Sequence, residues 1–189
     1  MDNRTPQLQR AIKVLGARQR QNTQVAKPQA TKLVDKTYYL NVKVDGMSGI
    51  NELVDANTKK VVGITNFDGN LLNSGRDVVI DAIRVQFTTR GEKIESADWQ
   101  SRDTLPAELQ NADLRLIQTN DMLIDLPLTD VQNFKNEDYR PIATTPLLRA
   151  KEEFKLELEF PKGVTVPMSK NGGCGMFLRF EFRVTEAKK

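Results

Sequence analysis

The chain has 189 residues, of which 39% are hydrophobic and 28% are charged. This length suits one domain with an added arm, and the composition is that of an ordinary globular protein. Histidine is absent, which excludes serine–histidine and cysteine–histidine nucleophiles, histidine bases and histidine metal ligands. No apolar run approaches the roughly 18 residues of a membrane-spanning helix, and we expect no secretory signal because the N-terminus lacks an apolar core.

The net charge of +3 is distributed unevenly along the chain. Residues 1–32 hold seven basic side chains and one acidic side chain, whereas the remaining 157 residues hold 21 basic and 24 acidic side chains. A basic arm therefore precedes a mildly acidic body. Such an arm usually contacts something negative, such as nucleic acid, an anionic membrane or an acidic protein surface.

Residues 7–21 of this arm have a helical pattern, and the polar residues 22–31 resemble a tether. A helix this short is marginal in water, so it needs a surface to lie on. Three interpretations stay open: a solvated tail, docking on a neighbouring subunit, and contact with nucleic acid or a membrane. The arm lacks aromatic residues, so contact with nucleic acid would be with phosphates and sensitive to salt. The predicted partner-binding residues are Arg4, Leu8, Arg10, Ile12, Lys13, Leu15, Arg18 and Arg20.

From residue 37 the hydrophobic pattern changes from helical to alternating, which is typical of strands with one buried face. The two clearest strands come last. Four apolar residues alternate with charged ones between Phe154 and Phe160, and five alternate with Phe177 and three charged residues between Met176 and Val184. The predicted strands are residues 37–44, 61–67, 77–89, 113–118, 122–128, 153–160 and 176–184.

Seven or eight strands with little helix between them predict an all-β fold, an antiparallel β-sandwich over residues 33–189. The connections over residues 90–112 and 129–146 are long. Long connections favour Greek-key pairing over a simple meander, so we expect a single jelly roll preceded by the helical or extended arm of residues 1–32.

The C-terminal third resembles the closing strands of small jelly-roll capsid proteins of viruses. The similarity lies in TPLLRAKEEFKLELEFP at residues 145–161, a glycine-containing loop, and MFLRFEFRV at residues 176–184. Those families often carry a flexible basic N-terminal arm, which residues 1–32 resemble. The resemblance implies a virion protein that forms symmetric oligomers and whose arm reaches neighbouring subunits, the genome or an inner membrane. Residues 90–112 have no counterpart in it.

The other candidate sites favour structural interpretations. Gly172-Gly173-Cys174-Gly175 precedes a strand and lacks the Lys-Ser or Lys-Thr of a phosphate-binding loop, so a hairpin loop is expected. Cys174 is the only cysteine, which rules out an internal disulfide. Acidic pairs such as Asp98 with Asp103 are expected to be solvated, because nothing in the sequence brings them together. Trp99 is either an interface anchor or a plug at the end of the sandwich.

The sequence therefore predicts a virion structural protein: a capsid, vertex or minor shell subunit, made in the host cytoplasm and located in the virion. Its expected partners are copies of itself and other virion subunits. We expect no catalytic residue, cofactor, metal ion or small-molecule substrate. The alternative is a monomeric β-sandwich binding module, for example for carbohydrate, with Trp99 and Tyr139 as its contact residues.

Overall fold

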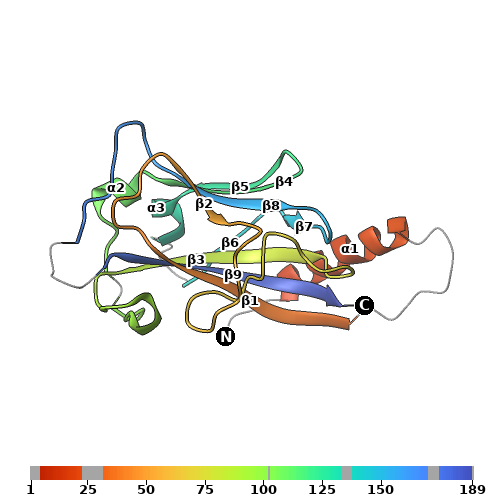
Figure 1. The fold of residues 1–189 in the computed structure, drawn as a ribbon. Helices are drawn as coiled ribbons and strands as arrows, with labels where there is room; N and C mark the ends of the chain where they lie inside the picture. Colours follow the sequence, from red (N-terminus) through yellow and green to blue (C-terminus); the bar gives the residue numbers. More distant parts are fainter. Residues whose placement is uncertain (1–4, 23–31, 102, 133–137, 170–174, 189) are drawn as a thin grey trace.

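The computed structural model describes residues 5–22, 32–101, 103–132, 138–169 and 175–188. Two antiparallel sheets of five and four strands pack as a sandwich, and the helix α1 (Thr5–Asn22) lies beside them (Figure 1). The predicted all-β sandwich with an N-terminal helix is therefore confirmed.

The larger sheet has the order β1-β9-β3-β6, and the short strand β7 also pairs with β3. The smaller sheet has the order β2-β8-β4-β5. The strands of the larger sheet are β1 (Lys32–Lys43), β3 (Val78–Thr88), β6 (Arg140–Pro141), β7 (Leu147–Leu148) and β9 (Phe177–Lys188). Those of the smaller sheet are β2 (Ile50–Val54), β4 (Asp113–Gln118), β5 (Asp121–Pro127) and β8 (Phe154–Glu159). The remaining helices are the 3₁₀ turn η1 (Ile94–Ser96), α2 (Ala107–Gln110) and α3 (Leu128–Gln132).

The strand pairs are nested along the sequence, from the two ends of the chain inwards. The first strand pairs with the last, β2 with β8, β3 with β6 and β7, and β4 with β5. Successive pairs alternate between the two sheets. A long antiparallel hairpin wound in this way has the strand order of a jelly roll, in which two Greek keys close over one core.

The core lies between the sheets and consists of the side chains that the alternating patterns select. Each fully buried Leu, Ile or Phe side chain stabilises the fold by about 1.5–3 kcal/mol relative to an exposed one. The apolar face of each strand therefore points inward. The predicted inward residues of the last two strands are all buried: Phe154, Leu156, Leu158, Phe160, Met176, Leu178, Phe180, Phe182 and Val184.

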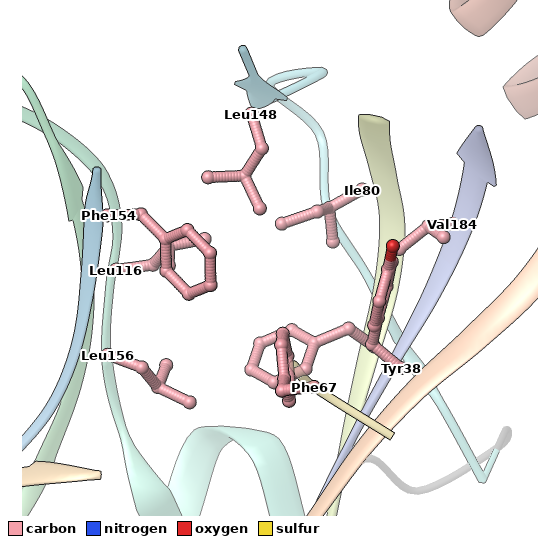
Figure 2. Close-up of a pocket in the computed structure, with 9 residues that line it drawn as sticks. Tyr38, Phe67, Ile80, Leu116, Leu148, Phe154, Leu156 and Val184 are labelled. Atoms are coloured by element: carbon pink, nitrogen blue, oxygen red, sulfur yellow. The ribbon is translucent and has the colours of Figure 1, made fainter. Parts of the chain in front are cut away.

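A small cavity remains in this core. Figure 2 shows its lining, in which Leu116, Phe154 and Leu156 of the smaller sheet face Ile80 and Val184 of the larger one. Its volume is about 10 Å³, which is room for about one water molecule. An apolar cavity of this size stays dry, so we interpret it as a packing gap and not as a ligand site.

Four features of the strand prediction are corrected. Residues 61–67 are not a strand, because residues 61–65 form a tight turn: Val61 and Thr65 exchange backbone hydrogen bonds, and Gly63 has φ +88°. The strand β2 was missed because Val54 is its only buried residue. The connection predicted over residues 129–146 contains α3 and β6, and β1 begins five residues earlier than the pattern predicted, at Lys32.

Helix α1 packs on the outer face of the larger sheet. Ala11 and Leu15 are buried against Val79 of β3 and Ala187 of β9, which lie on the side of the sheet away from the core. Figure 1 shows the helix beside the C-terminal end of β9, while α2 and α3 lie at the opposite end of the sandwich. The arm helix therefore lies on a surface of its own chain.

We predict that Leu15→Ala detaches α1 without unfolding the sandwich. Leu15 is 2% exposed in a small cluster apart from the main core, so its loss costs about 2 kcal/mol of local stability. Hydrogen exchange should show α1 losing protection about thirtyfold while β3 and β9 keep theirs. Leu8, which is 44% exposed on the same helix, is the control, and Leu8→Ala should leave exchange unchanged. Equal exchange in both variants would contradict the docking.

Candidate functional site

The outer face of the larger sheet carries a cluster of charged side chains. Period-two alternation places Arg179, Glu181 and Arg183 of β9 on this face, opposite the core residues of the same strand. The neighbouring strand adds Arg84, which pairs with Glu181 across the sheet. We call these four residues, together with Tyr139, the outer-face cluster.

Glu181 is the centre of the cluster and is buried. Its Oε1 accepts a hydrogen bond from Arg179 Nε (2.6 Å). Its Oε2 accepts hydrogen bonds from Arg84 Nε (2.8 Å) and the Tyr139 hydroxyl (2.7 Å), and Arg84 Nη2 also contacts this oxygen. A buried carboxylate is tolerated when it is paired and hydrogen-bonded in this way.

These contacts change the acidity of the two groups that they join. Burial raises the pKa of Glu181, but the hydrogen bonds from Tyr139 and Arg179 and the charge of Arg84 lower it more, so its pKa lies below the ordinary glutamate value. Burial, together with the hydrogen bond to Glu181 and its negative charge, raises the pKa of Tyr139 to about 12. Glu181 is therefore ionised and Tyr139 is neutral at physiological pH.

Aromatic rings hold the guanidinium groups in place. Arg84 lies over the Tyr139 ring at 4.6 Å and Arg183 at 5.2 Å from its centre. Arg179 lies 4.8 Å from the centre of the Tyr39 ring and 5.8 Å from that of Trp99. Such stacking lowers the conformational freedom of arginine, so the charges are presented in fixed positions.

A polar hollow opens beside the cluster. Its volume is about 440 Å³, and it is lined by Arg84, Gln86, Trp99, Gln100, Arg179 and Glu181. Gln86 Nε2 donates to the carbonyl oxygen of Trp99 (2.8 Å), which attaches the connection between β3 and β4 to the sheet. The predicted anchor Trp99 is thus half-buried at the wall of a hollow and contacts an arginine.

The predicted arm residues have divided roles. Leu15 is buried, while Leu8, Ile12 and Lys13 are exposed. Arg10 Nη1 donates to the Ala143 carbonyl oxygen (3.1 Å), and Arg18 lies 3.8 Å from Glu152. These contacts are with the chain's own sandwich. Arg4 and the side chain of Arg20 lie outside the described residues.

The other sequence candidates yield no further site. Cys174 and Gly172-Gly173 lie outside the described residues. Asp98 caps a turn and Asp103 pairs with Arg90 at 3.8 Å, so the structure gives these two carboxylates separate structural partners. Within the described residues, no group of three acidic or cysteine side chains is placed to hold a metal ion. None of the described helices is long and apolar enough to cross a membrane.

Comparison of the chain with protein-family models, with curated proteins and with solved structures found no match in any of the three. Functional inference therefore depends on the strand order and on the side chains of the molecule itself.

Sequence reasoning placed the arginines on the polar side of their strands but did not single them out. Arg179, Glu181 and Arg183 alternate on one strand, which is the signal of a charged outer face. Tyr139 comes from a connection far away in the sequence, and Tyr39 from β1, which flanks β9 on the side away from β3. The two tyrosines meet the arginines because of the strand order, and a local residue pattern does not predict strand order.

We predict that Tyr139→Phe raises the pKa of Glu181, because the carboxylate loses one of its hydrogen bonds. A depressed folded-state pKa contributes stability above the ordinary glutamate pKa, and this contribution is lost as pH falls through the folded value. The variant should therefore lose about 1–2 kcal/mol at neutral pH. Carboxyl-carbon NMR titration measures the pKa directly.

Tyr39→Phe is the matched control for this experiment. The Tyr39 hydroxyl accepts a hydrogen bond from the Gly63 amide at 3.3 Å and is not bonded to Glu181. The control should leave the titration of Glu181 unchanged. If Tyr139→Phe also left it unchanged, Glu181 would not be the centre of the cluster.

Proposed function

We propose that the chain is a virion structural protein, a capsid, vertex or minor shell subunit, that assembles with copies of itself and with other virion subunits. The observation that supports this most is the nested strand order β1-β9-β3-β6 and β2-β8-β4-β5. Viral capsid domains, lectins and cupins use this arrangement. As a virion component, the protein would be made in the host cytoplasm and located in the particle.

The interior of the sandwich favours a subunit over a protein that binds its ligand inside the fold. The cavity lined by buried side chains of both sheets measures about 10 Å³. Ligand sites commonly measure roughly 300–1,000 Å³. Contacts with other molecules must therefore be made by the loops, strand edges and outer faces.

Exposed apolar side chains mark where such contacts would form. Ile50 is 62% exposed and Met168 is 67% exposed. Ile50 begins β2 directly after the β1–β2 connection, and Met168 lies in the β8–β9 connection. These two connections pair with each other through Ser48 and Thr165. Large apolar residues that gather on paired loops favour a protein–protein contact over open solvent. We assign this loop pair to the contact between subunits.

The arm is proposed to connect the subunit to its surroundings. Its exposed residues Leu8, Ile12 and Lys13 face away from the sheet that α1 covers. This side of α1 combines apolar and positive groups, which suits a neighbouring subunit, nucleic acid or an anionic membrane.

A monomeric binding module, for example for carbohydrate, is the second candidate. The hollow beside Trp99 favours it, because sugar-binding surfaces use exposed aromatic rings. Binding of a neutral oligosaccharide on a glycan array, by a protein that stays monomeric at high concentration, would support this candidate over the virion subunit.

The assigned contact predicts a specific loss of assembly. The double variant Ile50→Lys, Met168→Lys introduces two charges where the subunits would meet, and burying them costs far more than the contact gains. Analytical ultracentrifugation should show the oligomer of the unmodified chain replaced by a monomer. Circular dichroism should remain that of the folded sandwich, because both positions are exposed.

Met122→Lys is the control for position. Met122 is 50% exposed at the turn between β4 and β5, away from the assigned loops, and its variant should assemble normally. An oligomer that survives the double variant would contradict the assigned contact. A monomer in the unmodified chain would contradict the proposed function itself.

A further inference from the structure

The outer face of the larger sheet offers hydrogen-bond donors of fixed geometry to a ligand. Within the described part of the chain, the acceptor recorded for Arg179 is Glu181, at Nε. The same side chain lines the hollow, with its guanidinium group fixed at Nε by Glu181. Arg84 uses Nε and Nη2 on Glu181, and its Nη1 lies 3.7 Å from the exposed Asp138, a weak partner that a stronger anion can replace.

The charge of this face favours an anion that extends along the sheet. The cluster holds three arginines against Glu181 and Asp138. Beyond Arg183 on the same outer face lies α1, whose 18 residues include four basic side chains and no acidic one. Between Arg183 and the helix, Thr185 of β9 donates to Asp81 and lies opposite Asp35 of β1. The positive groups therefore form two areas, one at the hollow and one on α1, and a polyanion can span both where a small isolated anion cannot.

The walls of the hollow add a second requirement. Trp99 supplies an aromatic surface, and Gln86 and Gln100 supply amide groups. A base stacks on an aromatic ring whatever its sequence, and a guanidinium binds the adjoining phosphate. The hollow is open to solvent, and its volume of about 440 Å³ lies in the range of small-molecule sites.

We propose that this hollow binds one nucleotide of a single-stranded nucleic acid. Arg179 and Arg84 hold its phosphate, Trp99 stacks on its base, and the strand continues along β9 towards α1. Glu181 fixes the two guanidinium groups before the ligand arrives, which lowers the ordering cost of binding. The site differs from the predicted contact of the arm, because base stacking is part of it. This proposed site is present in a monomer as well as in an assembled subunit.

The only tryptophan of the chain lies in the hollow, so its fluorescence reports binding at this place and not at the arm. We would titrate the full-length protein with a short single-stranded oligodeoxynucleotide. Anisotropy of a labelled copy of the same strand measures total binding in parallel. The proposal predicts a saturable quench of Trp99 that weakens with salt. A duplex of the same sequence should quench less, because its bases are stacked inside.

Arg179→Gln should weaken the quench about tenfold. The matched control is Arg115→Gln on the other sheet, where Arg115 pairs with Asp125 and Glu159. The two arginines are 22% and 27% exposed, so the variants change charge and burial alike. The control should bind within about twofold of the unmodified chain.

Gln100→Glu tests the site without touching the cluster. Gln100 is exposed at the wall of the hollow, so the variant should fold normally even where Arg179→Gln does not. Its new negative charge should weaken the quench about tenfold by repelling the phosphate.

Three results would overturn the proposal. The first is strand binding seen by anisotropy with no change in Trp99 emission, which would place the ligand elsewhere. The second is an equal quench by inorganic phosphate, which would make the hollow a simple anion site. The third is a mononucleotide that binds as tightly as the oligodeoxynucleotide, which would show that the rest of the nucleic acid makes no contact with the protein.

Discussion

The pairing of the first strand with the last is the constraint on which the rest of the structure depends. Twelve residues of β1 lie antiparallel to twelve of β9, and this pairing brings the two halves of the chain together. Once it forms, β2 lies opposite β8, β3 opposite β6 and β7, and β4 opposite β5. Most of the contacts are long-range, so the fold gains little before the ends meet.

The same pairing creates the polar outer face. Because β9 lies in the middle of its sheet, its outward side chains are crowded by β1, β3 and the connections above them. Glu181 is buried there although it faces away from the core. A carboxylate in that position requires cations, and Arg84 and Arg179 provide them. Helix α1 covers only one end of this outer face. The arginine-rich hollow lies at the other end, which α1 leaves open.

The sequence predicts the strands that bury one whole face, because alternation is a local property. It fails for β2, β6 and β7, which are short or bury few side chains and are set by their partners. It also misjudges residues 61–67, where hydrophobic residues are used in a turn that needs glycine at position 63. The candidate site is only partly predictable: Arg179 and Glu181 follow from alternation, whereas Tyr139 and Trp99 come from connections whose positions depend on tertiary packing.

The central claim is that this jelly roll works as a subunit of an assembly. The most direct measurement is the mass of the full-length protein in solution, by light scattering, over a range of concentrations at low and high salt. The account predicts a discrete oligomer several times the mass of the 21.4 kDa chain. A protein that remains monomeric at every concentration and ionic strength would contradict it.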